Sequence, residues 1–124
     1  DWHTISAEED LKDANKFESE SMRKVGLIDE IAPRYRSTYF AHIFSGGYSS
    51  GYYSYVHAAV LDSDAFEAFK EVGDVFDSNL SSKLRSTIYS KGSTEEAMDL
   101  FVQFRGRKAE IGPLLKVRGL DGAE

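Results

Sequence analysis

The chain has 124 residues, and its apolar content of 41% is enough for one small hydrophobic core. Its 15 basic and 21 acidic residues give a net charge of −6, and the basic residues form no stripe, which argues against nucleic acid or an anionic membrane as partner. There is no cysteine, which excludes disulfides and thiolate metal ligands, and no apolar run nears the ~20 residues that span a bilayer.

The first forty residues are expected to hold one helix and an irregular connection. Ser6 opens a Ser-Ala-Glu-Glu capping box, so a helix should begin there, and Gly26 should end it. Residues 27–40 place Pro33 among basic and aromatic side chains, which suits an extended connection that leads into a site.

The next segment, residues 39–55, reads YFAHIFSGGYSSGYYSY and holds one histidine, five tyrosines and three glycines. So many phenol hydroxyls beside a glycine loop are typical of a site that binds a polar group on which charge develops. After the loop, Ser49 or Ser50 should cap a new helix, on which Tyr52 and Tyr55 would emerge from one face.

Four more helical segments follow in this interpretation, and no segment alternates as a half-buried strand would. The fold class is therefore all-α, with about five helices and a glycine- and tyrosine-rich loop. The expected segments are a helix capped by Asp62 or Ser63 and ended by Gly73, one over Leu80, Leu84 and Ile88, one behind a second capping box at residues 93–96 that carries Leu100, Phe101 and Phe104, and a short one before Gly119.

His42 precedes the glycine loop, between apolar neighbours. One interpretation is a histidine at the edge of the core, with a ring nitrogen bonded to a backbone carbonyl. The adjoining loop favours the other, in which the imidazole donates a hydrogen bond to a substrate backbone or an oxyanion.

The tyrosines Tyr48, Tyr52 and Tyr55 could form an aromatic packing stripe. Phenylalanine or leucine would pack equally well without a polar end to satisfy, which favours a chemical role for the hydroxyls. Tyr53 is expected to be structural. The glycines Gly46, Gly47 and Gly51 suit a loop that holds peptide backbone, whereas the loop lacks the pattern of a phosphate-binding loop.

The remaining candidates are weaker. Arg105 and Arg107 could bind a carboxylate, but a structural role at the end of a helix is favoured. The three histidines, His3, His42 and His57, have no metal-ligand spacing, so no metal site is expected within the chain.

Residues 33–55, PRYRSTYFAHIFSGGYSSGYYSY, together with FRGR at residues 104–107 and RGL at residues 118–120, resemble the C-terminal end of the thimet oligopeptidase and peptidyl-dipeptidase family of zinc metallopeptidases. The resemblance implies that residues 1–124 are a single C-terminal piece of a longer, mostly helical, two-lobed catalytic domain. It also implies a zinc ion in the intact parent, held upstream by a His-Glu-x-x-His helix and a glutamate; this chain contains no such motif.

By position, the resemblance assigns His42, Tyr52 and Tyr55 to transition-state stabilisation. Tyr48 and the glycines Gly46, Gly47 and Gly51 would bind the peptide substrate. Two positions depart from many relatives, which carry Trp where this chain has His57 and an acidic residue where it has Ala59.

The implied function is the substrate-binding and transition-state-stabilising part of a zinc metallopeptidase that hydrolyses short peptides. The expected partners are peptide substrates and the missing N-terminal part of the same polypeptide, and the piece alone should be inactive. A cytoplasmic parent is expected, with the periplasm as the other compartment. The alternatives are a stand-alone helical module that binds peptides without cutting them and a purely structural domain.

Overall fold

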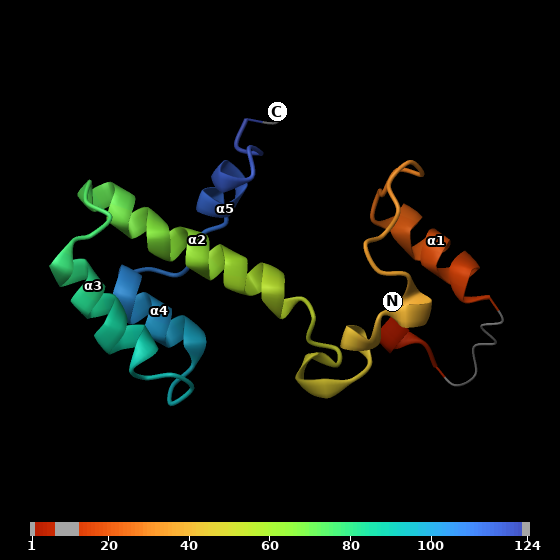
Figure 1. Ribbon diagram of the computed structural model, residues 1–124, viewed down its shortest axis with the longest axis horizontal. Coiled ribbons are helices and arrows are strands. Elements are labelled where there is room, and N and C mark those ends of the chain that lie inside the picture. Colours follow the sequence, from red (N-terminus) through yellow and green to blue (C-terminus); the bar gives the residue numbers. More distant parts are fainter. Residues whose placement is uncertain (1, 7–12, 123–124) are drawn as a thin grey trace. The chain divides into compact units, whose positions relative to one another are not determined.

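The computed structural model describes residues 2–6 and 13–122. The chain divides into two compact units, residues 1–53 and residues 54–124, and each is described by itself. Throughout the described ranges the regular structure is helical, with five α-helices and no strand (Figure 1). The predicted all-α class is confirmed.

The first unit contains one α-helix, α1 (Ala14–Lys24). The carboxylate of Asp13 caps it, accepting hydrogen bonds from the amides of Asn15 at 2.9 Å and Lys16 at 3.1 Å. Gly26 ends the helix as predicted, with a φ of +80° that favours glycine. The capping box expected from Ser6 includes residues 7–9, which lie outside the described ranges.

Short 3-10 turns make up most of the remaining regular structure in this unit. They are η1 (Trp2–Thr4), η2 (Ser37–Tyr39), η3 (Ala41–Ile43) and η4 (Gly46–Tyr48).

The second unit begins with α2 (Ser54–Val72), one helix of 19 residues. The predicted cap at Ser49 or Ser50 is wrong, since Ser50 has a φ of +53° and the helix starts at Ser54. The predicted division at Asp62 or Ser63 is also wrong. Neither glycine nor proline precedes them, so nothing there interrupts the backbone hydrogen bonds. Gly73 ends the helix as predicted.

The next helix, α3 (Ser78–Leu84), continues into a π-helical turn, η5 (Arg85–Tyr89). The predicted helix over residues 80–88 is confirmed, although its last turn is π rather than α. Its cap is Asp77, whose carboxylate accepts a hydrogen bond from the Leu80 amide at 2.6 Å.

Two helices close the chain, α4 (Ala97–Arg105) and α5 (Gly112–Val117). The predicted capping box at residues 93–96 is wrong, because α4 begins after Glu96 without a side-chain cap. The Glu95 carboxylate instead accepts hydrogen bonds from Lys91 at 2.8 Å and Gln103 at 2.9 Å. The short final helix is confirmed.

The core of this unit lies where α2, α3 and α4 meet. Phe69 and Phe104 are buried there with Ala68, and Leu80, Leu84 and Ile88 pack against them. Burying a phenylalanine side chain contributes roughly 1.5–3 kcal/mol. Leu114 is also buried and belongs to α5, which lies beside α2 (Figure 1).

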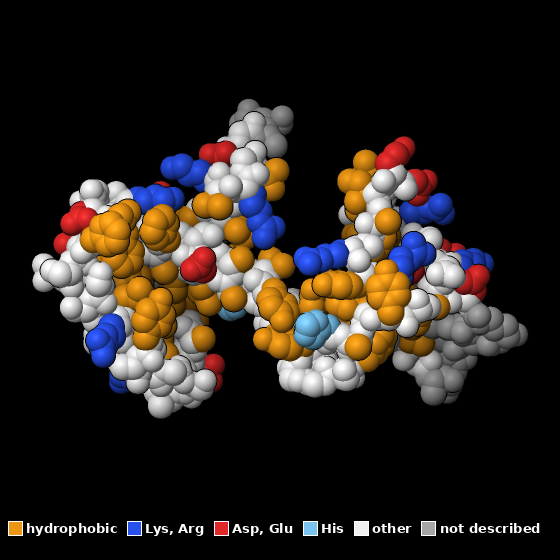
Figure 2. Space-filling model, in the orientation of Figure 1, with side chains coloured by type: hydrophobic (Ala, Val, Ile, Leu, Met, Phe, Trp, Pro, Cys, Tyr) orange, Lys and Arg blue, Asp and Glu red, His pale blue; other side chains and the backbone are white. Residues whose placement is uncertain are grey.

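Many large hydrophobic side chains remain exposed in both units (Figure 2). Val25 in the first unit is 76% exposed, and Phe76 and Tyr89 in the second are 87% and 74% exposed. None of the described helices combines the length and the apolarity needed to cross a bilayer.

Candidate active-site segment

Six of the seven residues predicted to form a site lie at the end of the first unit, and three of their side chains meet there. The His42 ring lies 5.4 Å from the Tyr48 ring, nearly perpendicular to it at 84°. It lies 5.7 Å from the Tyr52 ring, at 50°. Such tilted contacts are favourable for aromatic rings, because the positive edge of one faces the negative face of the other.

Exposure differs among these three side chains. His42 is exposed, Tyr48 is 40% exposed, and Tyr52 is half-buried. The His42 imidazole is therefore accessible to solvent, whereas the Tyr52 ring is partly covered by neighbouring residues. This is the arrangement expected of hydrogen-bonding groups that meet a ligand from a supported position.

The Tyr52 ring packs against an aromatic pair, Phe40 and Tyr35. The sequence predicted only an extended connection for these two residues. The Phe40 ring meets Tyr52 edge-on at 4.7 Å, and Tyr35 stacks on Phe40 at 4.9 Å. The guanidinium of Arg34 lies 5.3 Å from the centre of the Tyr35 ring. The aromatic residues in PRYRSTYF are the sequence feature that could have predicted these ring contacts.

The glycine loop turns back onto η3. The amide of Ser50 donates to the Ile43 carbonyl at 3.3 Å, and the amide of Gly51 donates to the Tyr48 carbonyl at 2.8 Å. Gly46 has a φ of +72°, a conformation that other residues adopt at a cost. A side chain at Gly47 would meet nothing within 4 Å, so the backbone requirement lies at Gly46.

Tyr55, the seventh predicted residue, lies in the first turn of α2 in the second unit and is 47% exposed. Tyr52 precedes that helix, so the expectation that both rings share one helix face is wrong. Tyr53, between them, is 72% exposed. His57 is exposed on α2 and Ala59 is half-buried on it.

A buried carboxylate, Glu18 on α1, lines the same cavity as Tyr52, and the sequence did not predict it. It is 5% exposed and accepts hydrogen bonds from the Ser37 amide at 2.6 Å and the Ser37 hydroxyl at 2.8 Å. The Arg36 Nε lies 2.8 Å from its other oxygen. Burial alone would raise the pKa of Glu18, but the Ser37 hydrogen bonds and the Arg36 charge outweigh it and lower this pKa.

The first unit also contains a cavity of about 410 Å³. Its walls are mainly apolar and aromatic, and Tyr52 is one of them. Sequence periodicity could not reveal the cavity, since it forms between α1, η1 and the residues that follow Pro33.

In the second unit, Asp64 on α2 is fully buried and completely paired. It accepts hydrogen bonds from Arg107, from the Arg105 Nε at 3.2 Å and from the Glu110 amide at 2.8 Å. Arg105 also pairs with both carboxylate oxygens of Glu71, at 2.7 and 2.8 Å. The two arginines thus have structural partners, through a buried carboxylate rather than through the helix dipole.

These contacts set the charge state of the cluster. Burial opposes ionisation of Asp64, but the hydrogen bonds from Arg107, the Glu110 amide and Arg105 outweigh it and lower the pKa of Asp64. Hydrogen bonds from its guanidinium to Glu71 and Asp64, against its own desolvation, raise the pKa of Arg105. Asp64 is therefore an anion held between cations.

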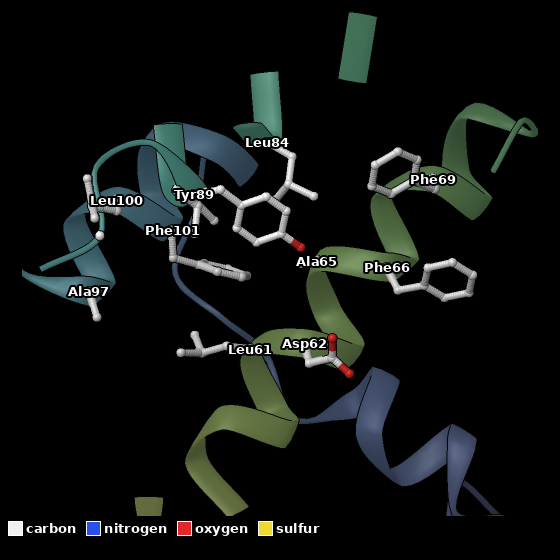
Figure 3. A pocket seen from close by; sticks show the side chains of 12 residues that line it. Leu61, Asp62, Ala65, Phe66, Phe69, Leu84, Tyr89, Ala97, Leu100 and Phe101 are labelled. Carbon is white, nitrogen blue, oxygen red and sulfur yellow. The ribbon is translucent and has the colours of Figure 1, made fainter. Parts of the chain in front are cut away.

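A second cavity, of about 300 Å³, lies among α2, α3, η5 and α4 (Figure 3). The side chains of Leu61, Phe69, Leu84 and Phe101 line it together with the ring of Tyr89, as Figure 3 shows. It contains none of the predicted site residues.

A metal ion does not fit the described part of the chain. No group of three or more histidine, aspartate or glutamate side chains able to hold a metal occurs within residues 2–6 and 13–122. The zinc ion that the resemblance implies has no ligand set in these residues.

The sequence is similar to known peptidases. It is 38% identical over 121 residues to the dipeptidyl carboxypeptidase of Escherichia coli, covering 97% of this chain and 18% of the relative. It is 46% identical over 83 residues to oligopeptidase A of the same organism and 43% identical over 81 residues to that of Haemophilus influenzae. Those alignments cover 67% and 65% of this chain and 12% of each relative.

The chain therefore spans less than a fifth of the length of the curated relatives it matches. The model of Peptidase family M3 matches residues 1–120. The chain belongs to Peptidase family M3.

Proposed function

We propose that the chain is the substrate-binding and transition-state-stabilising part of a zinc metallopeptidase that hydrolyses short peptides, as a peptidyl-dipeptidase or oligopeptidase. The observation that carries the proposal is the meeting of His42 with Tyr48 and Tyr52 beside the Gly46 turn, in a chain of a peptidase family. Peptide substrates and the rest of the parent polypeptide are its proposed partners.

In this role the two kinds of side chain act on different parts of the peptide. Attack of water on the scissile carbonyl leaves a negative charge on its oxygen, and the Tyr52 hydroxyl and the His42 imidazole can donate hydrogen bonds to it. Tyr55 is proposed as a further donor. Tyr48 and the glycines Gly46, Gly47 and Gly51 would hold the peptide backbone.

Zinc would be supplied by residues of the parent outside this chain, because the described residues contain no ligand set for it. The chain alone is therefore proposed to bind peptides without cleaving them. Cleavage of a short peptide by the purified 124-residue chain with added zinc would overturn this part of the proposal.

The first experiment compares two ligands of one sequence, a peptide and its phosphinate analogue, whose tetrahedral phosphorus imitates the transition state. Removing the Tyr52 hydroxyl by Tyr52→Phe should weaken phosphinate binding more than peptide binding, because a transition-state donor interacts most strongly with the developed charge. His42→Ala should act in the same direction. The measurement is the ratio of the two dissociation constants by calorimetry.

Tyr53→Phe is the matched control, since it removes a neighbouring hydroxyl from a side chain that is 72% exposed. Equal losses for peptide and phosphinate in Tyr52→Phe would favour a peptide-binding module without a catalytic role. If neither ligand binds the wild-type chain, the structural-domain alternative is favoured.

A second experiment places the chain in a complete enzyme. This chain would replace the 121 matching residues of the Escherichia coli dipeptidyl carboxypeptidase. In an active chimera, Tyr52→Phe should lower kcat by roughly 10²–10³-fold, the usual loss for one oxyanion donor, and Tyr53→Phe should leave it within about twofold. An unchanged kcat in the Tyr52→Phe chimera would contradict the proposed role.

A further inference from the structure

The cavity of the first unit has the dimensions of a ligand pocket. Its volume is about 410 Å³, within the roughly 300–1,000 Å³ usual for small-molecule sites. Trp2, Met22, Phe40 and Ile43 supply apolar walls, and Tyr52 joins the cavity to the candidate site.

Ser21, on α1, lines the cavity and has a buried polar group without a partner among the described residues. The side chain is 7% exposed, and its Oγ has no hydrogen-bond partner among the described residues. Burying a hydroxyl without a partner destabilises a protein, so such groups call for an explanation. A ligand with a hydrogen-bonding group would satisfy it.

Two other polar side chains of the cavity are already paired. Glu18 accepts from Ser37 and pairs with Arg36, and the Ser37 hydroxyl also accepts a hydrogen bond from the Trp2 Nε1 at 2.8 Å. The cavity therefore combines apolar and aromatic walls with the buried, unpaired hydroxyl of Ser21 and the side chain of Arg34. This combination suits a large aromatic side chain that ends in one hydrogen-bonding group.

The connection to the candidate site runs through Tyr52. Its ring lines the cavity and also lies 5.7 Å from the His42 ring. A peptide whose backbone meets His42 and Tyr52 would therefore have this cavity directly beside it.

We propose that this cavity is a specificity pocket that receives one side chain of the peptide substrate, with tyrosine preferred over phenylalanine and both over alanine. The proposal rests on the proposed function, since it takes the occupant to be part of the peptide. Ser21 would give the preference for the hydroxyl, and the apolar walls the preference for the ring.

The first test titrates the 124-residue chain with N-acetyl-tyrosinamide, N-acetyl-phenylalaninamide and N-acetyl-alaninamide and follows backbone and Trp2 indole signals by NMR. The tyrosine probe should bind about 5- to 10-fold more tightly than the phenylalanine probe, as one added hydrogen bond allows. Ser21→Ala should abolish this difference and leave phenylalanine binding within about twofold. Equal binding of all three probes, or none, would overturn the pocket.

The second test fills the cavity. Met22→Trp puts a bulkier side chain, an indole ring, into the pocket, whereas Glu20→Trp places the same ring at an exposed position of the same helix. Met22→Trp should weaken binding of the tyrosine probe at least tenfold, and Glu20→Trp should leave it within about twofold. The Ser37 amide signal checks that the α1 contacts persist in both variants.

The failures of the two proposals are distinguishable with peptides that vary at one position. If Tyr52→Phe weakens peptide binding but affinity ignores the varied side chain and Met22→Trp, the pocket is overturned while the proposed function stands. If the probes bind through Ser21 and the cavity while neither Tyr52→Phe nor His42→Ala affects peptide binding, the proposed function fails. The occupant would then not be a substrate side chain, and this inference fails with it.

Discussion

Arg107 donates two hydrogen bonds to the carboxylate of Asp64, from Nη1 to Oδ2 at 2.6 Å and from Nη2 to Oδ1 at 2.8 Å. This pair joins the middle of α2 to the segment after α4. Because Asp64 is fully buried, its charge depends entirely on such partners. The FRGR sequence is thus explained by an acid 41 to 43 residues earlier in the chain.

We expect Asp64→Asn to destabilise the second unit by about 3–5 kcal/mol, the usual cost of removing one partner from a buried ion pair. The amide cannot accept at both oxygen positions, so the hydrogen bonds from Arg107, Arg105 and the Glu110 amide are no longer all made, and the negative charge between the two guanidiniums is lost. Urea unfolding followed by far-UV circular dichroism measures the change.

Asp62→Asn is the control for that experiment, because Asp62 is exposed on the same helix. Its effect should stay within about 0.5 kcal/mol. A loss of less than 1 kcal/mol for Asp64→Asn would contradict the assigned role of the buried pair.

Acid should destabilise the second unit through the same carboxylate. The pKa of Asp64 lies below its ordinary value of 3.8 in the folded state, so the unfolded chain binds more protons. The stability that this group contributes is complete above about pH 5 and is lost as pH falls through the unfolded pKa and then the folded pKa. Unfolding free energies between pH 7 and pH 2.5 should show this loss in the wild type, and a smaller one in Asp64→Asn.

The first unit offers an independent measurement through Glu18. Glu18→Gln should destabilise it by about 2 kcal/mol, because the hydrogen bonds from Ser37 lose their charged acceptor while Arg36, which is partly exposed, regains water. Trp2 reports this change by fluorescence, since it is the single tryptophan and its Nε1 bonds to Ser37.

Glu20→Gln on the same helix is the matched control, because Glu20 is exposed and the Lys16 ammonium lies 3.9 Å from its carboxylate. This variant should leave the Trp2 transition within about 0.5 kcal/mol. Equal effects of the two substitutions would show that general charge, rather than the Ser37 hydrogen bonds, stabilises the unit.

The local signals in the sequence predicted the helix ends well. Gly26 and Gly73 end their helices because their positive φ angles relieve the backbone where the helix stops. The capping signals were less dependable. Asp62 and Ser63 lie inside α2. A capping side chain marks the start of a helix only where the residues before it are not already helical.

The candidate site could be predicted in composition but only partly in geometry. His42, Tyr48 and Tyr52 do meet, although through 3-10 turns rather than along one helix. The sequence did not predict three features of this unit. These are the packing of Tyr35 and Phe40, the buried Glu18 carboxylate and the unpaired Ser21 hydroxyl. Their roles come from contacts between segments distant in sequence, which no local pattern records.

The adjacent loop glycines Gly46 and Gly47 should respond differently to substitution by alanine. Gly46 has a φ of +72°, whereas Gly47 does not have a positive φ and an added side chain there would meet nothing within 4 Å. Gly46→Ala should therefore destabilise the first unit by about 1–2 kcal/mol, the cost of a left-handed backbone for alanine. Gly47→Ala should be neutral or stabilise it by up to about 1 kcal/mol, because alanine restricts the unfolded chain.

Urea unfolding followed by Trp2 fluorescence measures both stability changes, and peptide affinity measured on the same samples relates the turn to binding. If Gly46→Ala weakens peptide binding by more than its loss of stability explains and Gly47→Ala does not, the Gly46 turn positions His42 and Tyr48 for the ligand. If both variants bind as the wild type does, the turn has only a structural role.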